Sequence, residues 1–191
     1  MMTMSSSPER KRLHPHKFTM WIGLASIIMM FAGLTSAYIV KKANANWIEF
    51  RLPDVFWYST VAILLSSLTV HLSIKSFKAR EMSRYRTLIG ITALLGIVFV
   101  VLQFIGFREI EANGLPLFGT DSNPSASFVG IIAGLHGLHV LGGVIALVVM
   151  FLRAYIGTRK VYSSTGLEIA ATYWHFVDGL WIYLFIFLNW I

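Results

Sequence analysis

The stretch Ser127–Leu152, "SFVGIIAGLHGLHVLGGVIALVVMFL", decides the class of this protein, because its 26 residues include no Asp, Glu, Lys or Arg. The hydrocarbon core of a bilayer is about 30 Å thick, and a helix of roughly 20 apolar residues crosses it. Four further apolar runs reach that length, at Phe18–Val40, Val55–Ile74, Leu88–Phe107 and Leu167–Ile191. Strands would leave backbone polar groups unpaired in lipid, so the sequence predicts an all-α integral membrane protein, a bundle of five transmembrane helices.

The composition agrees with a single membrane domain. Hydrophobic residues make up 56% of the 191 residues and charged residues only 13%, against about 25% charged in soluble domains. Residues 1–16 are predicted to be a flexible cytoplasmic tail and residues 17–191 the transmembrane domain, with an external loop at 109–126. The first apolar run is longer than the roughly 7–15 residues of a signal peptide core, so we expect it to remain as a span. With no cysteine, disulfides, thiolate metal sites and covalently attached haem are excluded.

The net charge of +7 reflects topology rather than a nucleic-acid partner. Twelve of the 16 Lys and Arg residues fall on one side of the predicted spans. These are Arg10, Lys11, Arg12, Lys17, Lys75, Lys78, Arg80, Arg84, Arg86, Arg153, Arg159 and Lys160. Cytoplasmic loops of membrane proteins carry an excess of basic residues, so we expect the N-terminus in the cytoplasm and the C-terminus outside.

Two pairs of polar residues lie inside the last two spans, where ionisable groups are costly. His136 and His139 in the fourth span, and His175 and Asp178 in the fifth, are each three residues apart and share one side of their helix. All four lie near mid-membrane at a rise of about 1.5 Å per residue, so they meet if the helices are neighbours. One interpretation is a haem or metal site with histidine ligands. The other is structural, with Asp178 accepting a hydrogen bond from a histidine or tryptophan N–H.

Two further features of the spans predict how the helices pack against each other and where the membrane boundaries lie. Gly130, Gly134 and Gly137 give the fourth span a flat strip suited to close contact between helices. Aromatic residues gather at the predicted membrane boundaries, as in the aromatic belts of membrane proteins. They are Tyr38, Trp47, Trp57 and Trp190 on the outer side and Trp21, Tyr85 and Tyr155 on the inner side.

The last two spans closely resemble subunit III of the haem-copper cytochrome oxidases. The family pattern G-[FL]-H-G-L-H-V is met by Gly134–Val140, and E-x6-H-F-V-D with a later Trp is met by Glu168, His175–Asp178 and Trp181. The third span is similar through Gln103 and Glu109, and the resemblance covers residues 18–191. It implies the subunit III fold in its short bacterial form, which has five helices.

The resemblance also implies a function. Subunit III of these oxidases holds no redox centre: haem a, haem a3 and copper belong to partner subunits I and II. It packs mainly against subunit I, binds phospholipid and supports proton uptake by subunit I in a proton-pumping complex of aerobic respiration. On this view no residue here is catalytic or binds a cofactor or metal. Instead, His136, His139, Glu168, His175 and Asp178 form a structural polar network.

We therefore expect a multi-pass subunit of an aa3-type cytochrome c oxidase in the bacterial cytoplasmic membrane, one that could also join a respiratory supercomplex. The chain departs from the family at two carboxylate positions, where Ile27 and Gly106 stand. Direct proton relay by this chain is therefore weakly supported. A quinol oxidase subunit III is the first alternative. The second is a free-standing haem-binding or transport protein that uses the histidines.

Overall fold

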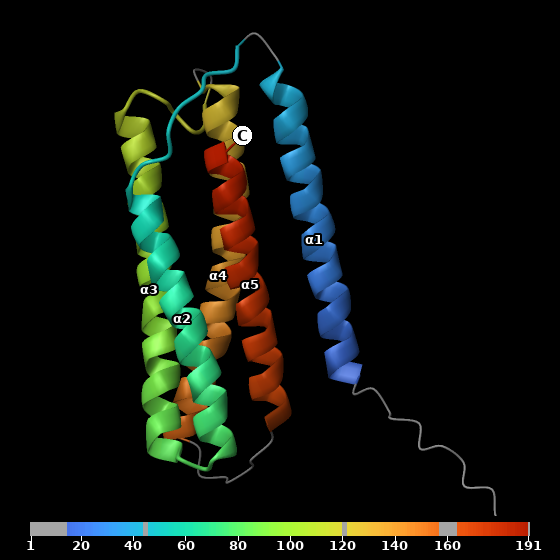
Figure 1. Cartoon of the computed structure of the whole chain (residues 1–191), viewed down its shortest axis with the longest axis vertical. Coiled ribbons are helices and arrows are strands. Elements are labelled where there is room, and N and C mark those ends of the chain that lie inside the picture. Colours follow the sequence, from blue (N-terminus) through green and yellow to red (C-terminus); the bar gives the residue numbers. More distant parts are fainter. Residues whose placement is uncertain (1–14, 44–45, 120–121, 157–163, 191) are drawn as a thin grey trace, which may run out of the picture.

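The computed structural model describes residues 15–43, 46–119, 122–156 and 164–190. Its regular elements are α1 (Pro15–Lys42), α2 (Val55–Lys78), α3 (Met82–Ala112), α4 (Pro124–Ile156) and α5 (Ser164–Trp190). Successive helices run in opposite directions along one long axis (Figure 1). All five are long and apolar enough to cross a membrane. The predicted all-α fold with five membrane-spanning helices is therefore confirmed.

The helices extend beyond the apolar runs that predicted them. The third apolar run covers residues 88–107, but α3 continues from Met82 to Ala112. Backbone hydrogen bonds within a helix do not depend on lipid, so polar flanks such as Glu109 and Glu111 prolong α3 instead of opening a loop. The expected loop at 109–126 thus begins four residues later, at the C-cap Asn113. Most of the predicted tail, residues 1–14, lies outside the described residues, and its last two residues belong to α1.

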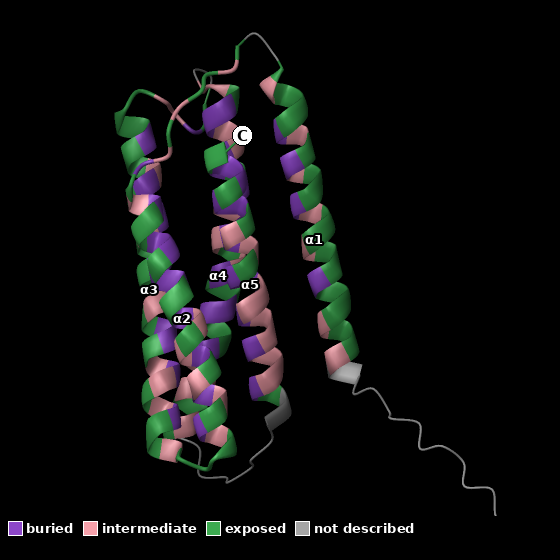
Figure 2. Cartoon of the chain, viewed as in Figure 1, coloured by how far each residue is buried: buried purple, intermediate pink, exposed green. Residues whose placement is uncertain are grey.

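The helices α2, α3, α4 and α5 form a closed ring, and α1 lies outside it. In the described part of the chain, α2 contacts α3 and α5, and α4 contacts α3 and α5, whereas α1 contacts only α4 and α5. Figure 1 shows α1 standing apart from α2 and α3, and Figure 2 places buried residues on the inward sides of the helices. We call the end of the bundle that holds the α2–α3 connection the turn end. The opposite end, where residues 46–54 join α1 to α2, is the loop end.

Trp174 of α5 fills the centre of the ring and requires glycine on α4, beside it, and on α3, across the ring. A Cβ atom placed on Gly96 of α3 would lie 2.7 Å from the indole, and one on Gly143 of α4 would lie 2.8 Å from it. Real side chains do not approach so closely, so the missing Cβ atoms are what admit the large ring. Gly106 of α3 makes room for Phe56 of α2 in the same way, at 2.6 Å.

The glycine strip predicted on α4 packs differently from the expectation. A Cβ atom on Gly134 or Gly137 would meet no described atom within 4 Å. Gly130 faces Leu117 and Phe118, at 3.3 Å from each, and these belong to the α3–α4 connection rather than to a helix. The expected helix contact through this strip is therefore not made within the described chain, because α4 turns Gly143 toward α5 instead. Helix packing through Gly134 and Gly137 stays a prediction.

The C-terminal end of α2, at the α2–α3 turn, is fixed by two backbone hydrogen bonds. Arg80 has a positive φ of 61°, and its N–H donates to the carbonyl of Phe77 at 3.1 Å. The next N–H, of Glu81, donates to the carbonyl of Ser76 at 3.0 Å. This pair of bonds is the Schellman arrangement that usually ends a helix at glycine. Arginine occupies that position here, at a cost in backbone strain.

Candidate functional site

His136 of α4 is buried among aromatic rings. Its ring stacks on Trp181 of α5, with centroids 5.1 Å apart and an interplanar angle of 28°, and meets Phe99 of α3 edge-on at 5.8 Å. The side chain is 0% exposed. Neither ring nitrogen has a hydrogen-bond partner among the described residues. The side chain therefore serves chiefly as a flat ring that joins α3, α4 and α5.

His139, one helical turn further on, contacts α1 and α5. Its Nδ1–H donates to the carbonyl of Leu135 at 2.7 Å, within α4. The ring meets Phe31 of α1 edge-on at 5.8 Å. Its own backbone carbonyl accepts a 3.0 Å hydrogen bond from the hydroxyl of Tyr173 on α5. His139 thus lies at the junction that ties α1 to the ring of helices.

The polar pair on α5 faces α2 instead of the α4 histidines. Nδ1 of His175 forms a 2.7 Å hydrogen bond with the hydroxyl of Ser67, and its ring lies 6.3 Å from the ring of His71. Asp178 is 2% exposed, and neither of its oxygens has a hydrogen-bond partner of good geometry among the described residues. Ser67 also lies near Asp178, but its described hydrogen bond is the one to His175.

The two polar pairs do not bond directly to each other in the described residues, and their role as one structural network stays a prediction. No described hydrogen bond joins a side chain of the α4 pair to one of the α5 pair, and Asp178 accepts none from a histidine or tryptophan. The rotation of α5 turns Trp181 and Tyr173 toward α4 and turns His175 toward α2. Within the described residues, no three His, Asp or Glu side chains are grouped so that they could hold a metal ion.

The tryptophans of α5 instead bond to hydroxyls on α2. The indole N–H of Trp174 donates to Ser66 at 3.0 Å, and that of Trp181 donates to Thr60 at 2.9 Å. A third bond between helices runs from the amide of Gln103 on α3 to Ser59 at 3.1 Å. The sequence signal missed was the series of hydroxyl residues at helical spacing along α2. They are Ser59, Thr60, Ser66, Ser67 and Ser73.

Glu168 is the centre of an ion-pair cluster at the turn end. Its two carboxylate oxygens each lie 3.3 Å from a lysine Nζ, one from Lys17 of α1 and one from Lys78 of α2. The Glu168 side chain is one-third exposed. Three helices are thus joined by one carboxylate, which gives α1 its charged contact with the rest of the bundle.

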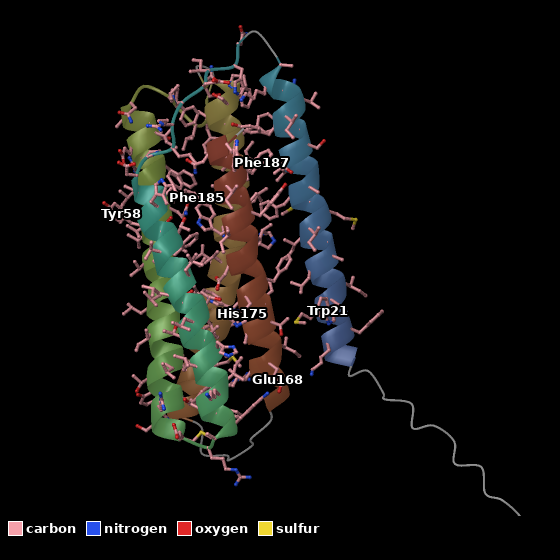
Figure 3. The ribbon with its side chains drawn as sticks, viewed as in Figure 1. Trp21, Tyr58, Glu168, His175, Phe185 and Phe187 are labelled. Atoms are coloured by element: carbon pink, nitrogen blue, oxygen red, sulfur yellow. The ribbon has the colours of Figure 1, made fainter. Side chains whose placement is uncertain are left out.

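A cavity of about 590 Å³ opens beside this cluster, between α1, α2 and α5. Figure 3 shows Trp21 on α1 and Glu168 and His175 on α5. The lining combines three lysines and one carboxylate with apolar side chains and His71 and His175 further along α2 and α5. The lysines are Lys17, Lys75 and Lys78. With two excess positive charges at its rim and apolar walls, the cavity suits an anionic amphiphile.

When the sequence is compared with known proteins, the part of the chain that carries both polar pairs and Glu168 matches one protein family. The family model described as cytochrome c oxidase subunit III matches residues 47–191. The chain is 30% identical to cytochrome c oxidase subunit 3 of Bacillus sp. (strain PS3) over an alignment of 191 positions, gaps included, that covers 96% of this chain and 90% of that relative. It is 31% identical to the probable cytochrome c oxidase subunit 3 of Nocardia farcinica over an alignment of 174 positions, gaps included, that covers 86% of this chain and 82% of that relative.

Proposed function

The chain belongs to the cytochrome c oxidase subunit III family, and from this premise we propose that it is the non-redox subunit III of a proton-pumping oxidase that passes electrons from cytochrome c to O₂. Its relatives are subunits of an oxidoreductase, so it works in a complex with other oxidase subunits. We place it against subunit I and near subunit II, which would carry haem a, haem a3 and copper. In this proposal it has no activity alone and supports assembly, lipid binding and proton uptake by subunit I.

The observation that supports a non-redox role is that the histidine side chains inside the bundle are already engaged in contacts with other residues. His136 stacks on Trp181, His139 bonds its own helix and His175 bonds Ser67. A haem ligand needs a ring nitrogen directed into a flat cavity, and neither cavity described here includes His136 or His139. His175 does line the 590 Å³ cavity, but its Nδ1 is already bonded to Ser67. These residues therefore support a scaffold role.

We propose that the turn end faces the cytoplasm. The described basic residues that support this orientation gather at that end. They are Lys17, Lys75, Lys78, Arg80, Arg84, Arg86 and Arg153. Arg159 and Lys160 lie outside the described residues. A basic face near the proton entrance of subunit I would hold anionic lipid there. Because the spans lack carboxylates at Ile27 and Gly106, this support is indirect rather than a proton relay through the chain.

We propose that the 590 Å³ cavity binds the phosphate of a membrane phospholipid. Lys75 lines the cavity without an ion pair among the described residues, while Lys17 and Lys78 share Glu168. Exposed apolar residues continue from the cavity along α1, including Trp21 at 62% exposed and Ile22 at 56%. A phosphate at the lysines with acyl chains along α1 would fill both parts of this site and hold α1 on the bundle.

Deletion of the chain from its native membrane tests the proposed function. We expect the a-type haem spectrum of the remaining complex to stay intact, because the haems lie in partner subunits, while the rate of sustained turnover falls. Loss of the haem spectrum from an otherwise assembled complex would contradict the non-redox role.

Each of the two alternative functions predicts an experimental result that differs from those expected here. A quinol oxidase subunit III would co-purify with a subunit II that lacks a copper-binding motif, and its complex would oxidise quinol but not cytochrome c. A free-standing haem protein would show a haem band in the isolated chain. Changing His136 to Ala would then abolish that band while leaving the fold intact.

A further inference from the structure

A second cavity, of about 320 Å³, lies at the loop end, far from the lysine cluster on α1, α2 and α5. It is bounded by the last turn of α1, by residues 47–52 of the α1–α2 connection and by the last residues of α5. At this level α2 and α4 begin and α1 and α5 end, so the helices leave the apolar part of the membrane here. The cavity therefore lies at the depth of lipid headgroups.

Charges of both signs line this cavity. Nζ of Lys42 lies 3.0 Å from Oε1 of Glu49, whose side chain is 77% exposed and so keeps its second oxygen accessible. Arg51 lines the same cavity and is exposed, and no hydrogen bond or ion pair is described for it. The cavity thus offers two cations and one carboxylate within a single short stretch of chain.

Aromatic rings form its apolar part. Trp47 meets Tyr38 edge-on at 4.7 Å, which holds the connection against α1. Trp190 lines the cavity from α5 and is 85% exposed. Exposed Trp at the end of a membrane helix is typical of contact with headgroups and the first carbons of acyl chains. Apolar side chains of Ile48 and Leu188 complete the wall.

We propose that this cavity binds one phospholipid whose headgroup carries a primary amine, the phosphatidylethanolamine class. The phosphate lies at Arg51 and Lys42, because guanidinium and ammonium groups are strong donors to phosphate oxygens. The ammonium group of the lipid donates to the free oxygen of Glu49. The carboxylate selects against anionic headgroups that lack an amine, and a quaternary amine has no N–H with which to donate to it. This inference does not depend on the oxidase assignment.

Lipid photolabelling of the complete native complex tests the proposal. The complex is reconstituted in phosphatidylcholine vesicles that contain equal small amounts of photoactivatable phosphatidylethanolamine or photoactivatable phosphatidylglycerol. Labelled peptides that contain residues 46–54 or 188–190 are then quantified by mass spectrometry. We expect the phosphatidylethanolamine probe to label these peptides more strongly. Glu49→Gln and Arg51→Gln should each lower that labelling by roughly tenfold, the loss expected for one charge-assisted hydrogen bond.

Lys41→Gln is the matched control, because Lys41 is exposed at the same level but does not line the cavity. It should leave the labelling unchanged. Equal or stronger labelling by phosphatidylglycerol would overturn the proposal, as would labelling that survives Glu49→Gln. A cross-link from these peptides to a partner subunit, with no lipid label, would also overturn it, since a protein segment would then occupy the cavity. The comparison of the two probes needs no variant and so holds even if a variant fails to assemble.

Discussion

Trp174 shows how single residues set the packing of this bundle. Its indole N–H would be costly to bury without a partner, and Ser66 provides one at 3.0 Å. Its ring fits only because Gly96 and Gly143 lack side chains. One large residue on α5 therefore depends on three small residues on α2, α3 and α4.

Gly96→Ala should destabilise the chain by about 1–3 kcal/mol, the usual cost of overpacking. The added Cβ atom would lie 2.7 Å from both Trp174 and Val144, and neither can move without disturbing the ring of helices. Reversible unfolding in mixed detergent micelles measures the change in the free energy of unfolding.

Gly134→Ala is the control for that prediction, because the added Cβ atom meets no described atom within 4 Å. The isolated chain should keep or slightly gain stability, since alanine favours helix over glycine by about 1 kcal/mol. If Gly134 packs against another subunit, the same change lowers retention of the chain in the complex. A loss of stability in the isolated chain as large as that of Gly96→Ala would contradict the described packing.

The sequence predicted which residues are special in the last two spans, but not which residues they contact. His136 and Asp178 are indeed deeply buried, at 0% and 2% exposed. Their partners depend on how α4 and α5 rotate about their axes, and periodicity within one helix contains no information about that rotation. The hydroxyls of α2 that receive the tryptophans were overlooked because Ser and Thr inside a span often bond their own helix. Ser59 and Thr60 do so as well, through the carbonyl of Phe56.

At the level of helices, α2 and α3 end in the same hydrogen-bonded turn within the described residues, but with a different residue at its positive-φ position. After the C-cap Asn113 of α3, Gly114 has a φ of +80°, and the N–H groups of Gly114 and Leu115 donate to the carbonyls of Glu111 and Ile110. α2 ends in the same arrangement but with Arg80 at the positive φ. Glycine reaches this conformation without strain and arginine does not.

Arg80→Gly should therefore stabilise the chain by about 0.5–1 kcal/mol, provided that relief of backbone strain exceeds the entropy that glycine adds to the unfolded chain. Gly114→Ala is the matched opposite change and should destabilise by a similar amount, since a Cβ atom at a φ of +80° is strained even in open space. Thermal unfolding of both variants in one detergent gives the comparison. Destabilisation by Arg80→Gly would show that the arginine side chain contributes more than its backbone strain costs.

Predicted element boundaries were least accurate at the helix ends. Apolar runs mark the part of a helix that lies in lipid, whereas the helix itself ends where a cap replaces the next hydrogen bond. α4 illustrates this. It begins at Pro124, three residues before the predicted start of the span at Ser127. It begins there because the side chain of Asn123 accepts a 3.0 Å hydrogen bond from the backbone N–H of Ser125. Proline at the first helical position fits that arrangement.

For the whole molecule, the position of α1 outside the ring is the feature that no sequence pattern indicated. All five spans read alike as apolar runs, and the order of helices around a bundle depends on packing between them. α1 is joined to α5 by the hydrogen bond from Tyr183 to Thr35, at 3.3 Å, and by the ion pair of Lys17 with Glu168. The cavity between α1, α2 and α5 lies next to that ion pair.

Glu168→Gln should let the first turns of α1 move away from α2 and α5. The chain has no native cysteine, so Ile22→Cys and Leu68→Cys place two spin labels without further changes. We expect the distance distribution across the cavity to broaden toward longer distances in Glu168→Gln. Since a partly exposed ion pair contributes only about 0–1 kcal/mol, overall stability should change little.

Glu111→Gln is the control, because Glu111 is exposed at the far end of α3 and no ion pair is described for it. It should leave the distance distribution unchanged. Raising the salt concentration should broaden the native distribution toward that of Glu168→Gln, since salt screens exposed charges. An identical distribution in Glu168→Gln and the native chain would show that the ion pair does not hold α1.

The central claim is that this chain is a scaffold subunit without a redox centre of its own. Purification from the native membrane in gentle detergent, followed by a reduced-minus-oxidised spectrum before and after the partners are stripped away, tests it most directly. We expect an a-type haem signal that co-purifies with large partner subunits and leaves with them, so that the isolated chain shows no haem band. Haem or metal that stays with the isolated chain would make the buried histidines ligands and would contradict the account.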